Sequence, residues 1–186
     1  MSKNSAWFIN EAKRNSEEKM MNIYEIENDH LPAIGEAELS DEQVMEELHS
    51  IRKELGDRLV VLGHHYQQDD VISLADHTGD SLQLAREAAK LDSEYIVFCG
   101  VHFMAETADM LTRPGQKVIL PDMNAGCTMA DMANRIEIDR AWKYIQESSG
   151  PDKIVPITYI NCSASLKDFV GANDGAICTS SNAKKV

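Results

Sequence analysis

Short apolar runs alternate along the chain with stretches in which apolar residues recur every three or four positions. The runs predict strands at 59–62, 95–99, 117–121, 153–160 and 176–178. The stretches between them predict helices at about 44–55, 70–77, 103–112, 128–147 and 163–170, with another helix beginning near Asp80. Alternation of this kind is typical of βαβ units. It predicts an α/β fold whose parallel sheet is covered by helices on both faces.

The two ends of the chain fit this pattern less well. Residues 1–40 are acidic and weakly periodic, which predicts an extension with some helix and no assigned role. Asp41 is the expected N-cap of the first predicted helix, and Gly56 is its expected end. Residues 179–186 begin with N-capping hydroxyls but leave barely one helical turn, which is too short to bury a face. We therefore expect the chain to be the N-terminal piece of a longer protein.

The charge balance limits the partners that the chain can bind. With 31 acidic and 18 basic residues, the formal net charge is −13, which leaves no basic footprint for nucleic-acid phosphates. No apolar run approaches the length of a membrane span, and the N-terminus lacks the apolar core of a secretory signal. We expect a cytoplasmic protein that binds neither nucleic acid nor membrane, and that holds any anionic ligand through local groups.

The four cysteines form no CxxC pair, so a self-contained zinc finger is not expected. Cys99 and Cys178 lie in apolar strand runs, where a buried thiol is the ordinary outcome. Cys127 lies instead in a loop of small residues before a predicted helix, with Thr128 as the expected N-cap. Because a helix N-terminus favours thiolate over thiol, Cys127 is the best candidate for a metal ligand or a nucleophile.

The first predicted strand breaks at Gly63 and delivers His64, His65 and Tyr66 to its carboxyl end. Open α/β sheets bind ligands at that edge, so this cluster predicts a site. The nearby aspartates at 69 and 70 also allow a mononuclear metal site, although no spacing in the sequence fixes two ligands on one helical face. The residues alone leave both interpretations open.

Hydroxyl groups at predicted helix starts mark possible seats for anions. Ser81 lies in the first turn after the expected N-cap Asp80, beside free backbone N–H groups. Tyr159 and Asn161 alternate along a strand end, so both point to one face of that strand. Ser180 opens another helix start after the next strand. Together these residues suggest a ligand with more than one anionic group.

Seven short motifs, taken in order, resemble the quinolinate synthase family. They are His64-His-Tyr-Gln67, Leu74-Ala-Asp76, Gly79-Asp-Ser-Leu82, Gly100-Val-His-Phe-Met-Ala-Glu-Thr-Ala108, Ala125-Gly-Cys-Thr-Met-Ala130, Tyr159-Ile-Asn161 and Cys178-Thr-Ser-Ser-Asn-Ala183. The resemblance runs from about residue 59 to residue 186 and leaves out residues 1–40. Each motif is weak by itself, and their order makes the resemblance specific.

The resemblance implies a fold and a reaction. The family is built from three-layer αβα domains with short parallel sheets in a pseudo-threefold arrangement. This chain would then hold an extension at 1–40, a first domain at 41–127 and an incomplete second domain at 128–186, with the third domain absent. The implied reaction condenses iminoaspartate with dihydroxyacetone phosphate to quinolinate, with loss of phosphate and water, in NAD biosynthesis. An aspartate-oxidising enzyme that supplies iminoaspartate is an implied partner.

The resemblance also assigns roles to residues. Three cysteines, one per domain, hold a four-iron, four-sulfur ([4Fe–4S]) cluster with one iron open as a Lewis acid, and Cys127 matches the first of them. Cys99, Cys162 and Cys178 match no ligand position. The implied catalytic residues are Tyr66 and Tyr159, and the implied substrate-binding residues are His64, Ser81, Tyr159, Asn161 and Ser180. Because one thiolate cannot hold a four-iron cluster, the 186-residue chain alone is expected to be inactive.

Two other functions remain open at the level of sequence. A non-catalytic α/β module or regulatory fragment could bind phosphate at the Ser81 and Ser180 helix starts, and it would not depend on Cys127. A mononuclear metal hydrolase built on His64, His65 and nearby aspartates would lose its metal when His65 is changed.

Overall fold

The computed structural model describes residues 39–149 and 154–186, so the expectation for residues 1–40 lies outside the described residues except at its last two positions. The elements are α2 (Asp41–Leu55), the 3-10 helix η2 (Gly56–Arg58), β1 (Leu59–His64), α3 (Asp69–Ser73), β2 (His77–Gly79), α4 (Ser81–Ala88), β3 (Tyr95–Cys99), α5 (His102–Leu111), β4 (Lys117–Ile119), α6 (Arg135–Ser149), β5 (Ile157–Tyr159), α7 (Ala164–Ala172) and β6 (Ala176–Cys178). In the part of the chain described, no helix is both long and apolar enough to cross a bilayer.

Sheet A has four parallel strands in the order β2-β1-β3-β4, and sheet B pairs β5 with β6, also in parallel. The predicted α/β class with short parallel sheets is therefore confirmed. Strand β2 was not predicted, because a helix was expected over 70–77. The backbone N–H of Asp76 instead donates to the carbonyl of Val61 at 2.8 Å, while its carboxylate accepts from the N–H of Val61 at 2.7 Å. These bonds start the β1–β2 ladder and end the helix early.

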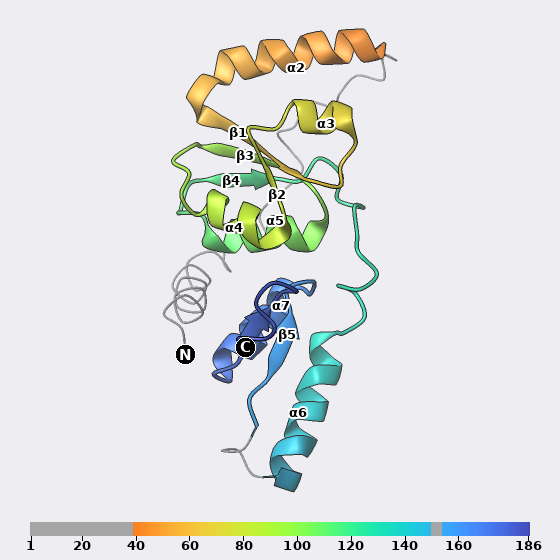
Figure 1. The fold of residues 1–186 in the computed structure, drawn as a ribbon, viewed down its shortest axis with the longest axis vertical. Helices are drawn as coiled ribbons and strands as arrows, with labels where there is room; N and C mark the ends of the chain where they lie inside the picture. Colours follow the sequence, from red (N-terminus) through yellow and green to blue (C-terminus); the bar gives the residue numbers. More distant parts are fainter. Residues whose placement is uncertain (1–38, 150–153) are drawn as a thin grey trace.

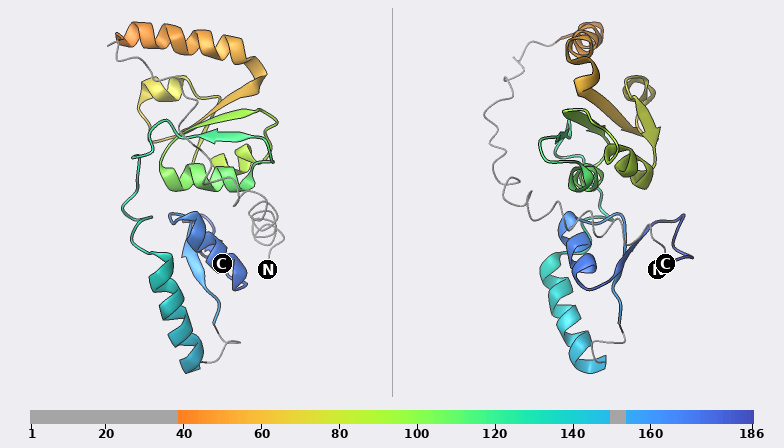
Figure 2. Two further views of the ribbon diagram at one scale, coloured as in Figure 1. Left: turned by 180° about the vertical axis from the view of Figure 1, so that it is seen from behind. Right: turned by 90° about the vertical axis from the view of Figure 1, so that its left-hand side faces the viewer.

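The chain has two parts: the first runs from α2 to β4 and holds sheet A, and the second runs from α6 to β6 and holds sheet B. The core of the first part lies between sheet A and the pair of helices α4 and α5. Leu62, Ile96 and Phe98 have no exposed surface, and Leu84 of α4 is equally buried against them. Figures 1 and 2 show α4 and α5 on one face of sheet A and α3 on the other. This is the three-layer αβα arrangement that the alternating pattern predicts.

Helix α2 lies apart from this core, although its periodicity was correctly predicted. Its N-cap is Ser40 rather than Asp41, since Ser40 and Gln43 form a reciprocal capping box. Gly56 ends the helix at φ 52°, which suits glycine. The side chain of Ile51 remains 48% exposed, so the apolar stripe of α2 is not part of the described core. Arg52 attaches the helix by donating to Asp76 at 2.5 Å.

The second part begins with a longer loop than the sequence suggested. Helix α6 starts at Arg135, not near 128, because Ala130 folds back in a turn and donates to the carbonyl of Cys127 at 2.8 Å. Ala130 is thereby buried in the apolar core of the first part. The side chain of Asn134 accepts from the N–H of Glu137 at 3.0 Å and caps α6 in place of Thr128.

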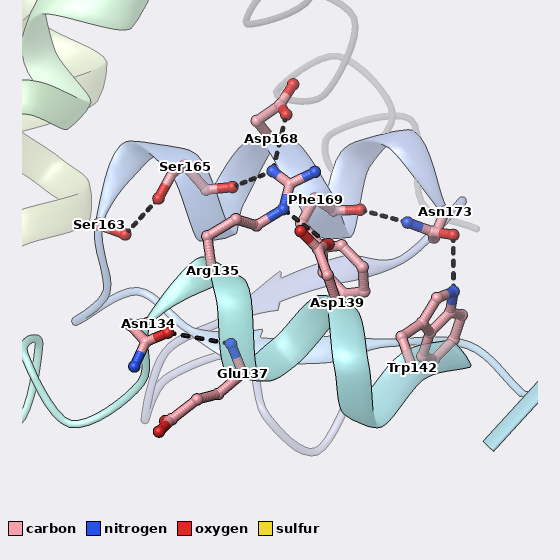
Figure 3. A network of polar contacts seen from close by, with 10 residues as sticks. All are labelled: Asn134, Arg135, Glu137, Asp139, Trp142, Ser163, Ser165, Asp168, Phe169 and Asn173. Atoms are coloured by element: carbon pink, nitrogen blue, oxygen red, sulfur yellow. Dashed lines mark hydrogen bonds and ion pairs between the residues drawn. The ribbon is translucent and has the colours of Figure 1, made fainter. Parts of the chain in front are cut away.

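Polar contacts join α6 to α7, and Figure 3 shows them. Arg135 donates to the carbonyl of Ser165 at 2.9 Å and pairs with Asp168 at 3.2 Å. Trp142 donates to the side chain of Asn173 at 3.0 Å. After β6, residues 180–185 form hydrogen-bonded turns rather than the start of the helix that was predicted there.

Candidate active site

His64 is the last residue of β1, and its ring is 5% exposed at the carboxyl edge of sheet A. The ring lies 3.8 Å from that of Tyr66, centroid to centroid. The backbone N–H of Tyr66 donates to Nδ1 of His64 at 3.4 Å, so the neutral ring carries its proton on Nε2. Burial, and then the neighbouring His65, lower the pKa of His64 to about 4, while Asp80 opposes them. His64 is therefore a neutral hydrogen-bonding group at pH 7.

Tyr66 and Cys127 come together beside His64. Tyr66 is 53% exposed, and partial burial followed by the nearby Cys127 raises the pKa of its hydroxyl. Cys127 is half-buried and packs against the apolar core. The N–H of His102 holds the Cys127 loop by donating to the carbonyl of Ala125 at 2.8 Å. The helix-dipole argument for Cys127 was wrong, since α6 begins eight residues after it.

Ser81 is the first residue of α4, as predicted, and it lies close to His64 in the fold. The β1–β2 register places His64 opposite Gly79, two residues before Ser81. Asp80 is the N-cap, with its carboxylate accepting from the N–H of Gln83 at 2.8 Å. The Asp80 carboxylate thus already accepts a hydrogen bond from one of the N–H groups at the start of α4. His64, Tyr66, Ser81 and Cys127 are called the sheet-A group below.

Tyr159 and Ser180 form a second group at the carboxyl edge of sheet B. Their hydroxyl oxygens lie 2.7 Å apart, and the β5–β6 register, which pairs Tyr159 with Cys178, brings them together. The hydroxyl of Ser181 instead bonds to that of Thr179 at 2.8 Å. The pairing with Tyr159 singles out Ser180 among the two serines. Tyr159, Ser180 and the half-buried Asn161 are called the sheet-B group.

Few side chains in the described residues are placed to ligate a metal ion together. No group of three or more histidine, cysteine or carboxylate side chains gathers there around one point. His65, a candidate ligand, has its Nδ1 3.1 Å from the carbonyl oxygen of Gly79. Cys162 is buried, while Cys99 and Cys178 are only half-buried, less than their strands suggested. Cys127, in a loop at the sheet edge, fits the role of one thiolate ligand of a larger cluster.

Sequence reasoning missed two residues, Glu106 and Lys167, at the contact between α5 and α7. Glu106 stood in a motif without a role, and Lys167 is 3% exposed on α7, where a solvated lysine would be expected. The only signal in the sequence is that Lys167 occupies a position of the apolar face of α7, next to Leu166 and Val170.

Comparison with known proteins is consistent with these motifs. Residues 46–186 match the family described as Quinolinate synthetase A protein. The chain is 57% identical over 146 residues to a quinolinate synthase of Nocardioides sp., which covers 78% of the chain and 37% of that protein. It is 54% identical over 168 residues to the quinolinate synthase of Bacillus subtilis, covering 90% of the chain and 45% of the relative. The chain thus spans less than half the length of these relatives, and it belongs to the quinolinate synthetase A family.

Proposed function

We propose that the chain supplies part of the active site of a quinolinate synthase, which acts in NAD biosynthesis. The enzyme would condense iminoaspartate with dihydroxyacetone phosphate to quinolinate, with loss of phosphate and water. One observation carries the proposal: the family motifs place His64, Tyr66 and Cys127 together at the carboxyl edge of a parallel sheet. Such edges are the usual ligand sites of α/β folds.

In this proposal the sheet-A group handles polar atoms of the substrate without adding charge. His64, neutral because of its lowered pKa, would donate a hydrogen bond from Nε2 to a substrate oxygen. Tyr66 keeps its proton at neutral pH, because the pKa of its hydroxyl is raised, and would act as a proton donor during dehydration. The exposed face of the Tyr66 ring leaves room for a ligand to reach that hydroxyl.

The anionic ends of the two substrates would be held by hydroxyl and amide groups. Ser81 would bind one carboxylate or the phosphate at the start of α4, where backbone N–H groups are free. Tyr159, Ser180 and Asn161 would bind a second anionic end, because hydroxyl and amide groups donate to oxygen without a fixed positive charge. Tyr159 would also be the second catalytic hydroxyl, next to the bound substrate.

Cys127 would be one thiolate ligand of the [4Fe–4S] cluster that the family implies. When bound, such a cluster supplies an open iron that polarises a substrate oxygen as a Lewis acid. The other three cysteines lie on β3, on β6 and before α7, and none joins Cys127 in a ligand set within the described residues. A polypeptide of these 186 residues alone is therefore proposed to hold no stable cluster and to make no quinolinate.

The proposal extends to partners and location. The reactants are small molecules, and iminoaspartate is unstable enough in water that an aspartate-oxidising enzyme nearby would be its natural source. The strongly acidic composition is consistent with a cytoplasmic enzyme that binds neither nucleic acid nor membrane.

The test uses the protein produced from its complete gene and reconstituted anaerobically with iron and sulfide. The parent is expected to form quinolinate, and Cys127→Ala is expected to lose both the cluster absorbance and turnover. Cys99→Ala, a matched change at a half-buried thiol on β3, should keep both. A Cys127→Ala protein with parent cluster content contradicts the ligand assignment. A parent without turnover that binds inorganic phosphate equally well with and without Cys127 would favour a non-catalytic phosphate-binding module.

A further inference from the structure

Glu106, on α5, makes a hydrogen bond that joins the two parts of the chain. Its Oε2 accepts from the backbone N–H of Ala164, the first residue of α7, at 3.0 Å. The N-cap residue Ser163 makes no capping bond with its side chain, and its hydroxyl pairs with that of Ser165 at 2.9 Å. A carboxylate at a helix N-terminus satisfies a free N–H and meets the positive end of the helix dipole. Glu106 therefore caps a helix to which it does not belong.

Lys167 strengthens the same contact one turn further along α7. Its ammonium group is buried, donates to the carbonyl of Cys162 at 2.5 Å, and lies 5.5 Å from the centre of the Phe103 ring. Phe103 and Glu106 are three residues apart on α5, so they share one face of that helix. Burial lowers the pKa of Lys167, and the nearby Cys162 and Glu106 act in the opposite direction. The contact thus combines an apolar ring, a carboxylate and a buried cation.

Each of the two helices in this contact is bound to, or directly follows, a loop that bears one residue of a candidate group. The first residue of α5 holds the loop of Cys127 through the bond from His102 to Ala125. The first residue of α7 follows directly on the loop that contains Asn161, and Lys167 ties that loop down at Cys162. In Figure 1, α5 lies beneath sheet A and α7 lies below it beside β5, and the two helices are in contact. The bond from Glu106 to α7 therefore links the two helices next to these loops.

We infer that Glu106 is a positioning residue, which holds the sheet-B group at a fixed place relative to the sheet-A group. The inference rests on the proposed function, because it treats both groups as walls of one substrate site. Glu106 touches neither group directly and acts through α7. Without its carboxylate, the N-terminus of α7 loses its cap, and the loop between Tyr159 and α7 gains freedom. A displacement of about 1 Å at a substrate contact can cost two orders of magnitude in rate.

The test compares three variants in the reconstituted protein from the complete gene. Glu106→Ala removes the cap, Glu106→Gln keeps an oxygen acceptor, and Glu87→Ala is the matched control. Glu87 is as exposed as Glu106, 28% for each side chain, but its partner Lys90 lies on the following turn of the same chain segment. We expect Glu106→Ala to lower kcat/KM by about 10-fold to 100-fold, chiefly through the KM of the substrate that the sheet-B group binds, with Glu106→Gln intermediate. Glu87→Ala should stay within about twofold of the parent.

Two further measurements separate positioning from a loss of structure. The cluster absorbance should be the same in all variants, since the Cys127 loop is held by the backbone N–H of His102 and not by the side chain of Glu106. Amide hydrogen exchange over residues 159–167 should rise most in Glu106→Ala, less in Glu106→Gln and not in Glu87→Ala, while exchange in sheet A stays unchanged.

Either of two results would overturn the inference. One is a Glu106→Ala protein whose kcat/KM, or whose hydrogen exchange over residues 159–167, equals that of the parent. The other is a loss of activity that only follows a loss of cluster or of folded protein. A parent that makes no quinolinate overturns the proposed function instead, and the exchange measurement then still decides whether Glu106 holds α7.

Discussion

The two parts of the chain are held together by different forces. In the first part, Leu62 and Phe98 of sheet A are fully buried beneath α4 and α5, and apolar packing fixes the strands. In the second part, sheet B has two strands and no residue of α6 is buried. There Arg135 and Trp142 attach α6 to α7 through hydrogen bonds and an ion pair. The first part is a closed core, and the second part depends more on polar contacts.

This difference extends to the candidate site. His64 is 5% exposed, and its burial, followed by the neighbouring His65, lowers its pKa. Tyr159 is 38% exposed, and its hydroxyl is placed by one bond to Ser180. Burial therefore fixes His64 within the sheet-A group, whereas Tyr159 depends on a hydrogen bond, and the helix that follows the sheet-B loop is anchored from outside by Glu106.

The largest effect is expected from emptying the core of the first part. Phe98→Ala removes a fully buried ring and should lower the free energy of unfolding by about 3–5 kcal/mol. Denaturant unfolding followed by circular dichroism measures the loss, and hydrogen exchange should rise throughout sheet A. In Phe169→Ala, exchange should rise in α6 and α7 and leave sheet A protected, since Phe169 packs on Trp142 and Arg135. Equal exchange in sheet A for both variants would contradict the division into two differently held parts.

A smaller effect follows from the buried imidazole of His64. Its pKa is about 4 in the folded chain against an ordinary value of 6.5, so between these values the unfolded chain binds a proton that the folded chain does not. Stability must then fall as the pH drops from about 6.5 toward 4, by roughly 2–3 kcal/mol at most. His64→Gln should flatten this slope, and NMR titration of the parent should place the midpoint of His64 near 4.

The exposed His49 of α2 supplies the control for this titration. His49→Gln should leave the slope between pH 4 and 6.5 as it is in the parent, because His49 is exposed on α2 and lies apart from the buried His64 ring. A His64 midpoint near 6.5 would show that the ring is open to water, and the contrast with the sheet-B group would disappear.

Much of the first part could be predicted from the sequence, because its signals are local. The apolar run at 59–62 specifies β1, and Asp80 followed by Ser81 specifies the start of α4. The errors arose where a tertiary contact overrode the local signal. Residues 77–79 form a strand because they pair with β1, directly after the hydrogen bond between the Asp76 carboxylate and β1. Pairing of this kind depends on residues that are distant in sequence, so the local periodicity of apolar residues does not predict it.

The candidate site was predictable to the same extent. Motif order assigned His64, Tyr66 and Cys127, and the fold brings these three together. The role of Glu106 could not be predicted, since its partner Ala164 is 58 residues away and offers only a backbone N–H. Because the partner is a backbone N–H, the type of residue at position 164 gives no indication of this hydrogen bond. The helix dipole assigned to Cys127 failed for a related reason, because the burial of Ala130 delayed α6 to Arg135.

The smallest losses of stability are expected from single substitutions in the polar network between α6 and α7 (Figure 3). Asp168→Asn removes one ion pair between half-exposed groups and should cost no more than about 0.5 kcal/mol, a difference that vanishes in 1 M salt. Arg135→Ala should cost more, about 1–2 kcal/mol, because Arg135 also donates to the carbonyl of Ser165 and covers the ring of Phe169 at 5.3 Å. Denaturant unfolding at low and high salt measures both. Equal losses of stability in the two variants would mean that charge alone attaches α6 to α7. If Arg135→Ala loses more stability than Asp168→Asn, and the difference persists in 1 M salt, hydrogen bonding and ring contact also attach α6.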